Sequence, residues 1–149
     1  MSDINFEIKR FDGLSTKELY KILRLRAEVF VVEQDCVYQD IDNKDQKALH
    51  VIGYKDENIV AYARIFAAGD YFDKASIGRV VVLEKERKYG YGHDLIKQSI
   101  SAIKENYKTN KIKISAQCYL KRFYEKHGFI QQGKEYLEDD IPHIAMITS

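Results

Sequence analysis

Two glycines stand among charged and aromatic residues in the segment Glu86–Leu95, ERKYGYGHDL. They are Gly90 and Gly92, in a chain with only 8 glycines, and they follow a run of valines. Helical periodicity follows them, and a helix start offers unpaired N–H groups and partial positive charge. Glycine lets a large anion approach the backbone, and Arg87 and Lys88 add cationic donors. The spacing therefore predicts either a phosphate cradle or a glycine-rich turn without a ligand.

The best-known nucleotide motifs do not fit this segment. A dinucleotide-binding fingerprint needs a third glycine where Leu95 stands, and a P-loop needs a Gly-Lys-Ser/Thr sequence that the segment lacks. Because short glycine motifs occur often by chance, the residues alone leave both alternatives open.

The composition bounds the class of protein. A length of 149 residues and a hydrophobic content of 45% predict one globular domain, residues 1–149, with a real core. The net charge of +1 and the absence of Trp argue against a nucleic-acid-binding module, although Tyr is plentiful.

The cysteine count and the apolar runs indicate the compartment. The two isolated cysteines, Cys36 and Cys118, form neither a disulfide framework nor a metal-binding motif, so no metal is expected. No apolar run approaches the roughly 20 residues of a membrane span, and the first residues lack a signal-peptide core. We therefore expect a cytoplasmic protein with no membrane partner.

Hydrophobic periodicity predicts the elements that position the glycine segment. Ser15 and Glu18 have capping-box spacing, which predicts a helix from Ser15 to about Val32. Residues 34–47 are polar and predict an ordered loop or a short helix. Further helices are expected at His93–Tyr107 and Tyr119–His127, and strands at Ile4–Lys9, Leu49–Tyr54, Ile59–Ala67, Ala75–Leu83, Lys111–Ala116, Phe129–Tyr136 and Ile144–Ile147. This order predicts an α/β (α+β) fold: a central mixed sheet with helices on both faces.

The motifs resemble those of a known family. Arg87-x-x-Gly90-x-Gly92 resembles the acyl-CoA motif of the GNAT superfamily, the GCN5-related N-acetyltransferases. The strand Gly78–Val82 is similar to the family's fourth strand, and Ala116–Phe129 resembles its other signature, a short helix with a tyrosine and a closing Gly-Phe. Four further segments resemble the ElaA-type branch: Val29–Gln34, Tyr38–Asp42, Ile77–Val82 and Tyr136–His143.

This resemblance implies acetyl-CoA as the acyl donor and assigns residues to it. The loop from Arg87 to Gly92 would hold the pyrophosphate, with His93 opening the helix. The fourth strand would pair with the pantetheine arm through its backbone. The residues implied in cofactor binding are Val80, Val81, Val82, Arg87, Lys88, Tyr89, Gly90, Tyr91, Gly92, His93 and Phe123.

The resemblance also implies a direct transfer mechanism. Tyr124 matches the tyrosine that protonates the leaving thiolate of CoA; a phenol has a pKa of about 10 against about 8.5 for a thiol. The amine would attack the thioester directly, and the N–H of Val82 would stabilise the oxyanion. Without the motif, Tyr124 would read as an ordinary packing residue of an amphipathic helix.

The general base and the acceptor contacts are less specified. Some members of the superfamily carry a carboxylate on the fourth strand, whereas Ala75–Arg79 has none. We rank Glu33 first and His143 second as the base. Acceptor contacts are expected from Asp40, Asp42 and Arg79, although Arg79 could equally form an internal salt bridge.

Two functions follow from the resemblance. The first is acetyl transfer from acetyl-CoA to a primary amine of a small molecule or peptide, by a monomer or homodimer. The second is a non-catalytic CoA-binding or protein-interaction module on the same fold.

Overall fold

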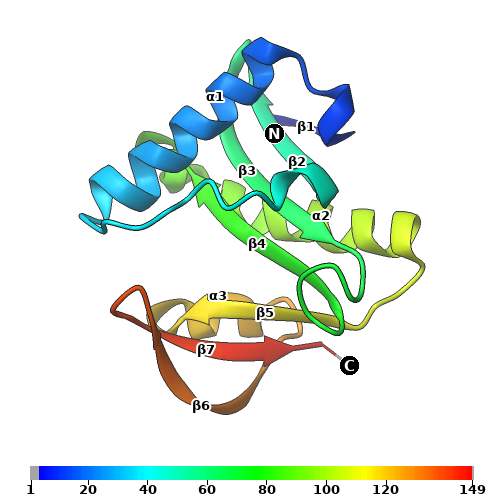
Figure 1. Ribbon diagram of the computed structural model, residues 1–149, viewed down its shortest axis with the longest axis vertical. Helices are drawn as coiled ribbons and strands as arrows, with labels where there is room; N and C mark the ends of the chain where they lie inside the picture. Colours follow the sequence, from blue (N-terminus) through cyan, green and yellow to red (C-terminus); the bar gives the residue numbers. More distant parts are fainter. Residues whose placement is uncertain (1–3, 149) are drawn as a thin grey trace.

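Residues 4–148 are described by the computed structural model (Figure 1). They form one mixed sheet of seven strands in the order β1-β2-β3-β4-β5-β7-β6. The strands are β1 (Ile4–Arg10), β2 (Leu49–Lys55), β3 (Asn58–Phe66), β4 (Ala75–Val82), β5 (Ile112–Gln117), β6 (Ile130–Glu138) and β7 (Ile141–Ile147). The α-helices are α1 (Thr16–Arg26), α2 (Tyr91–Tyr107) and α3 (Lys121–Glu125). The chain also has the π-helix η2 (Ala27–Glu33) and the 3₁₀ helices η1 (Phe11–Gly13), η3 (Asp45–Lys47), η4 (Glu84–Tyr89) and η5 (Cys118–Leu120).

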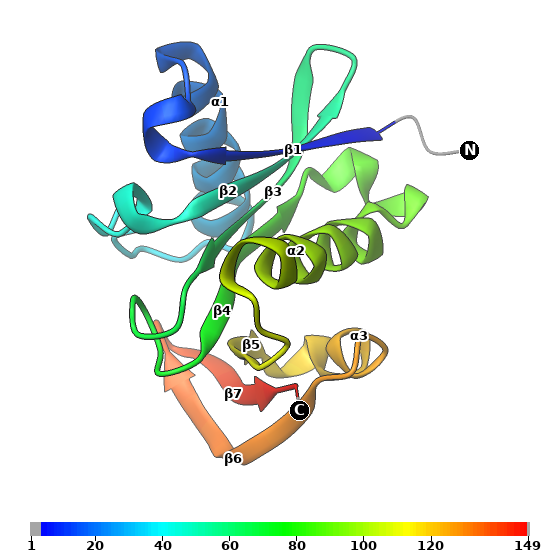
Figure 2. The ribbon, with the colours of Figure 1, turned by 90° about the vertical axis from the view of Figure 1, so that its right-hand side faces the viewer.

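The predicted α/β class and element order are confirmed, with helices on both faces of the sheet. Helix α1 covers one face, where Ile22 and Leu25 pack on β2 and β3. Helix α2 covers the other face together with α3, and Leu95 and Tyr124 belong to this second core (Figure 2). Each helix buries its apolar stripe against the sheet, as the periodicity predicts.

The first helix begins where the capping box predicts. The Glu18 N–H donates to Ser15 Oγ and the Ser15 N–H donates to Glu18 Oε1, both at 3.0 Å. The predicted helical extent to about Val32 agrees with the structure, but the helix type changes: α1 ends at Arg26 and the chain continues as the π-helix η2 to Glu33. Wider turns of this kind are common at functional sites.

Strands β4 and β5 separate almost as soon as they meet. Their parallel pairing is confined to Ala75 with Ile112 and Ser76 with Lys113. Beyond Ser76 the two strands diverge, and Figure 1 shows the opening between them. An ordinary sheet would pair these backbone groups along its whole length, so the divergence leaves polar edges that need other partners.

The last two strands differ from the predicted ones. We expected a connection from Leu137 to His143, but β6 and β7 continue into that segment and leave only Asp139 and Asp140 as the turn. Both residues have positive φ, 51° and 63°, which matches the twist of a two-residue hairpin turn. The longer strands bring Glu138 and His143 close to β5.

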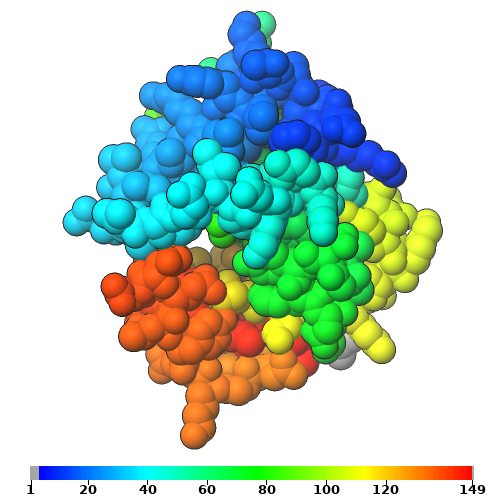
Figure 3. All heavy atoms as spheres, viewed as in Figure 1, coloured from blue at the N-terminus to red at the C-terminus, as the bar shows by residue number. Residues whose placement is uncertain are grey.

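The segment 34–47 crosses the molecule between α1 and the β6–β7 hairpin, as the cyan and orange atoms of Figure 3 show. It contains only the short turn η3, so the predicted ordered loop or short helix is confirmed. Within the described residues, positions 37–43 take part in no backbone–backbone hydrogen bond, so side-chain contacts hold this part of the segment.

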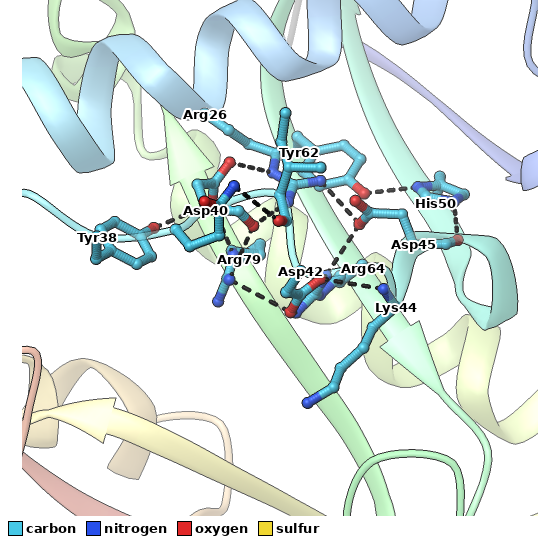
Figure 4. Close-up of polar contacts among 12 residues, drawn as sticks. Arg26, Tyr38, Asp40, Asp42, Lys44, Asp45, His50, Tyr62, Arg64 and Arg79 are labelled. Atoms are coloured by element: carbon cyan, nitrogen blue, oxygen red, sulfur yellow. Dashed lines mark hydrogen bonds and ion pairs between the residues drawn. The ribbon is translucent and has the colours of Figure 1, made fainter.

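Those contacts form a buried ionic cluster (Figure 4). Arg26 of α1 donates to Asp40 Oδ2 at 3.0 Å and to Asp45 Oδ1 at 2.8 Å. Arg64 of β3 donates to Asp42 at 2.6 and 2.8 Å and to Asp45 Oδ1 at 3.0 Å. Arg26 and Arg64 are fully buried, so each depends on these carboxylates.

The charges of the cluster change the pKa values of its acids. Burial alone would raise the pKa of Asp45, but Arg26 and Arg64 outweigh it and lower that pKa. Burial would likewise raise the pKa of Asp42, but the hydrogen bonds and charge of Arg64 outweigh it and lower that pKa. Both carboxylates are therefore ionised at neutral pH, and they fix the loop by charge-assisted hydrogen bonds.

Helices of membrane-spanning length and hydropathy are absent from residues 4–148.

We predict that Asp45→Ala destabilises the protein strongly, because it leaves Arg26 and Arg64 buried without a shared partner. The expected loss in the free energy of unfolding is roughly 3–5 kcal/mol, measured by urea denaturation. Asp73→Ala is the matched control, since Asp73 is exposed. Equal midpoints for the two variants would contradict the assignment.

Candidate active site

The opening beside β4 forms a cleft of about 420 Å³. On one side lie the strand residues Val80–Val82, and on the other lie the turn η5 and helix α3. The end of η2 and the start of α2 complete its walls. The lining residues are Val29, Phe30, Glu33, Gln34, Val80, Val81, Val82, Arg87, Gly90, Gly92, His93, Gln117, Tyr119, Leu120, Phe123 and Tyr124.

A second, smaller cavity of about 120 Å³ lies on the other side of the same opening. It reaches from β4 and β5 to the β6–β7 hairpin, and Figure 3 shows the hollow between the cyan segment and the orange hairpin. Six residues line both cavities: Phe30, Gln34, Val80, Gln117, Leu120 and Tyr124. The two cavities therefore meet at Tyr124, and we call them the cofactor cleft and the acceptor cavity.

The glycine segment lies at one end of the cofactor cleft. Residues Glu84–Tyr89 form the turn η4, and Gly90 has a φ of +75° at the entry to α2. We expected His93 to open the helix, but α2 begins at Tyr91, so Gly92 lies in its first turn. A side chain at Gly90 would meet no atom within 4 Å, so the space beside the helix start is open.

The two glycines therefore differ in their roles. Gly90 provides the left-handed turn that most residues adopt only with strain. At Gly92 an added Cβ would lie 3.4 Å from two ring carbons of Phe123, so the missing side chain lets α3 approach α2 closely.

The neighbouring residues of the motif are divided between the cleft and the core. Arg87 lines the cleft, whereas Lys88 lies outside it with its Nζ 5.2 Å from the Tyr89 ring centroid. Tyr89 is half exposed. Tyr91 is buried in the core, so only its backbone faces the helix start.

Arg87 forms a bidentate ion pair with Glu33. Its Nη1 and Nη2 lie 2.7 and 2.9 Å from the two carboxylate oxygens, and its Nε donates to the Val82 carbonyl at 3.0 Å. The hydrogen bonds to Glu33 raise the pKa of Arg87. The two side chains join the end of η2 to η4 across one wall of the cofactor cleft.

The backbone of β4 presents polar groups to the cleft. The Leu83 N–H donates to the Val60 carbonyl of β3 at 2.8 Å. Because successive N–H groups of a strand alternate, the N–H of Val82 points away from β3, toward the opening. Earlier in β4 the register with β3 shifts, and Arg79 has a positive φ of 50°. This bulge turns the strand at the boundary between the two cavities.

Tyr124 lies where the cavities meet, with 6% of its surface exposed. Burial, with a smaller contribution from Tyr119, raises its pKa well above the usual value. Within residues 4–148 its hydroxyl has no hydrogen-bond partner. The hydroxyl is not among the fully enclosed unpaired polar atoms of residues 4–148, so it borders the open space of the cavities, where a ligand would supply its partner.

His143 lines the acceptor cavity, and Glu33 lines the cofactor cleft. His143 Nδ1 lies 2.7 Å from the Ile141 carbonyl oxygen, which can only accept a hydrogen bond. Nδ1 therefore carries a proton, and in the neutral ring Nε2 is left with a free lone pair. The Glu138 carboxylate lies 3.5 Å from that Nε2.

The three residues predicted as acceptor contacts form one internal group. Arg79 Nε lies 2.8 Å from Asp40 Oδ1, and Arg79 Nη2 lies 3.0 Å from the Asp40 carbonyl and 3.4 Å from Asp42 Oδ2. The angle at Nε is poor, so this contact is an ion pair rather than a good hydrogen bond. Of the three, only Arg79 lines the acceptor cavity; Asp40 and Asp42 belong to the buried ionic cluster.

His93 faces a second histidine that the sequence did not single out. Its Nδ1 lies 2.8 Å from His127 Nε2, and both rings contact Phe123. Burial lowers the pKa of His127, and the neighbouring His93 adds to this. One ring must donate to the other, so the pair holds Phe123 and the start of α2 together.

Several site residues escaped the sequence reasoning. Gln34, Gln117 and Leu120 line both cavities; they lie within the segments Val29–Gln34 and Ala116–Phe129 that resemble the family, but the sequence assigned them no role. The role of Glu138 depends on the hairpin, which brings its side chain to β5. There Ser115 donates to Glu138 Oε1 at 3.2 Å.

The residues of the cofactor cleft suit a long, thin ligand with an anionic end. The start of α2 supplies unpaired N–H groups, the open space at Gly90 admits a phosphate, and unpaired β4 backbone lies along an apolar wall. These features fit the pyrophosphate and the pantetheine arm of coenzyme A.

Comparison with known proteins gives the family of the chain. A family model described as "Acetyltransferase (GNAT) domain" matches residues 15–149. The chain is 41% identical to Protein ElaA of Escherichia coli over 135 residues, which cover 89% of this chain and 88% of that protein. It is 40% identical to a UPF0039 protein of Schizosaccharomyces pombe over 148 residues, 98% of this chain and 97% of the relative.

Solved structures show the same fold. An acyl-CoA N-acyltransferase from Pseudomonas aeruginosa superposes with a TM-score of 0.91 at 37% identity, covering 97% of this chain and 99% of that one. The crystal structure of Escherichia coli ElaA gives the same TM-score and identity, with coverage of 98% and 99%.

Proposed function

Since the chain belongs to the GNAT family of acyl-CoA N-acyltransferases, in its ElaA-type branch, we propose that it transfers an acetyl group from acetyl-CoA to a primary amine. The observation that carries this proposal is the position of Tyr124. Its side chain lines both a cleft that fits coenzyme A and a cavity that fits a small acceptor, and its hydroxyl has no hydrogen-bond partner among residues 4–148.

We propose that the residues expected to hold the cofactor do so in three ways. The N–H groups at the start of α2, beside Gly90, bind the pyrophosphate. Backbone groups of Val80–Val82 hydrogen-bond the pantetheine arm as an added strand would. Phe123 and His93 wall the cleft, and Arg87 fixes the loop through Glu33 and Val82. Lys88 and Tyr89 lie outside the lining of the cleft and contact the cofactor only at its edge.

Bound acetyl-CoA supplies the thioester, whose carbonyl carbon is the electrophile. The N–H of Val82 faces the opening and is the donor for the charge that develops on the carbonyl oxygen. Tyr124 holds a proton at its hydroxyl for the departing thiolate. Because burial raises its pKa, that hydroxyl stays protonated across the physiological pH range.

The contacts favour His143 over Glu33 as the base, which reverses the ranking from sequence. An amine has a pKa near 10 and must lose a proton before it attacks. His143 lines the acceptor cavity, and its neutral ring has a free lone pair on Nε2, because Nδ1 donates to the Ile141 carbonyl. Both oxygens of Glu33 are bound by Arg87, on the cofactor side of Tyr124. Glu33 is therefore better suited to hold Arg87 than to accept a proton.

For Asp40, Asp42 and Arg79 we propose a positioning role rather than direct contact with the amine. Arg79 occupies the bulge of β4 with positive φ, a conformation that costs free energy for a residue with a side chain. Its ion pairs with the two carboxylates hold it there. The aspartates thus fix the shape of β4 between the two cavities.

We expect Tyr124→Phe to lower kcat by about 10²- to 10⁴-fold, the usual contribution of a general acid, and to change acetyl-CoA affinity little. Thiol release from acetyl-CoA with a panel of primary amines measures the rate, and Tyr20→Phe on exposed α1 is the matched control. Wild-type protein that binds acetyl-CoA but releases no thiol with any amine would instead favour the non-catalytic module.

Removal of the base should change the pH profile. His143→Gln is expected to lower kcat/KM at neutral pH by at least about tenfold and to recover at high pH, where more of the amine is already neutral. Glu33→Gln should raise the KM for acetyl-CoA and leave the profile unchanged. A changed pH profile in Glu33→Gln together with an unchanged profile in His143→Gln would identify Glu33 as the base.

Gly90→Glu should weaken acetyl-CoA binding by at least about tenfold, because it places an anion and a side chain where the pyrophosphate would bind. Gly69→Glu is the matched control. Both glycines have positive φ, and neither has an atom within 4 Å of an added Cβ, so the backbone strain is alike. Calorimetric titration would refute the assignment if the two variants bound acetyl-CoA equally.

A further inference from the structure

The acceptor cavity has an acidic mouth on the β6–β7 hairpin. Glu138 and Asp139 line the cavity, and Asp140 follows in the turn. Glu138 is half exposed, accepts a hydrogen bond from Ser115, and has a carboxylate oxygen 3.5 Å from His143 Nε2. In the described part of the chain, the carboxylates of Asp139 and Asp140 have no ion-pair or hydrogen-bond partner.

Arg79 does not neutralise this mouth. It is the one Arg or Lys among the described residues that line the cavity, and its guanidinium already faces Asp40 and Asp42. It also lies over the Tyr38 ring, 5.6 Å from the centroid. The buried cluster as a whole contains three arginines and three aspartates, so its net charge is zero and it does not attract an anionic ligand.

Direct contacts between opposite walls narrow the cavity. The Cys36 thiol lies 3.6 Å from the Asp139 carbonyl oxygen, and Gln34 lies 3.4 Å from Gln117. These contacts join the segment after η2 to the hairpin turn and to β5. A volume of about 120 Å³ has room for several water-sized groups, which suits a short alkyl chain better than a folded protein surface.

The two ends of the cavity therefore suit different chemical groups of a ligand. At the inner end, where the two cavities meet, the Tyr124 hydroxyl has no hydrogen-bond partner within residues 4–148 and marks the position of the thioester, which the amine must reach. At the outer end, Glu138 and Asp139 place negative charge at the surface, and within residues 4–148 neither is paired with an Arg or Lys side chain. A ligand that satisfies both ends has a neutral amine inside and a cation outside.

We propose, on the basis of the proposed acetyltransferase function, that the preferred acceptor is a small aliphatic diamine or polyamine. Glu138 and Asp139 bind its distal ammonium group, while the other amine is acetylated beside Tyr124 and His143. An acceptor with a distal carboxylate is repelled by the same two side chains, because like charges at the mouth raise its free energy.

Three acceptors of matched length test this proposal on the full chain. They are 1,4-diaminobutane, butylamine and 4-aminobutyrate, whose distal groups are cationic, neutral and anionic. We expect kcat/KM to fall in that order, with about three- to tenfold between the first two after correction for the two identical amines of the diamine. The gap should narrow as salt rises, since ions screen exposed charges.

Charge-removing variants then locate the effect. Asp139→Asn keeps a residue type that tolerates positive φ, and together with Glu138→Gln it should reduce the diamine-to-butylamine ratio toward one. The ratio is read within each variant, so any effect of Glu138 on His143 cancels. Glu105→Gln on the exposed face of α2 is the control and should leave the ratio unchanged.

Binding provides a readout apart from turnover. Calorimetric titration of 1,4-diaminobutane should show affinity that the double variant loses by a similar three- to tenfold factor, about the strength of two exposed ion pairs. Acetyl-CoA affinity should not change.

Three results would overturn the proposal: 4-aminobutyrate as the best of the three acceptors, a diamine preference that survives in the double variant, or selective turnover of a lysine-containing peptide over all three. Turnover of butylamine without charge preference would refute only this inference. Binding of acetyl-CoA without turnover of any amine would refute the acetyltransferase function itself.

Discussion

The divergence of β4 from β5 is the constraint on which the rest of the structure depends. A parallel pair normally continues its hydrogen bonds, but here pairing stops after Ser76 and Lys113. The divergence opens the sheet through its middle, creates a wall on each side, and leaves backbone donors and acceptors along β4 without strand partners. Both the cofactor cleft and the acceptor cavity are consequences of that single interruption.

A sheet split in this way must be held open by other contacts. On the β4 side, the buried arginines of α1 and β3 bind the aspartates of segment 34–47, and Arg79 joins the same group from the bulge. On the other side, β7 pairs with β5 and supports the hairpin that carries His143. Buried ion pairs add little net stability over apolar packing, but their directional bonds can specify one arrangement. Here that arrangement is the loop that closes the acceptor cavity.

The glycine segment shows how one short motif can meet two demands. Gly90 adopts the positive φ that turns η4 into α2, and it leaves open space beside the helix start. Gly92 allows Phe123 to pack against the first turn of α2. A turn and an anion site therefore need not be alternatives, because the turn is what exposes the helix N-terminus.

The sequence by itself determined the local structure and the family. The Ser15–Glu18 capping box, the α2 periodicity and the spacing of Arg87, Gly90 and Gly92 depend on neighbours within a few residues, so a pattern can reveal them. Long-range partners have no such pattern. Glu33 lies 54 residues from Arg87, and Asp45 lies 19 residues from both Arg26 and Arg64, so only the tertiary structure showed that they are ion-paired. It alone placed His143 and Glu138 at the acceptor cavity, because strand pairing sets the register that brings the hairpin to β5.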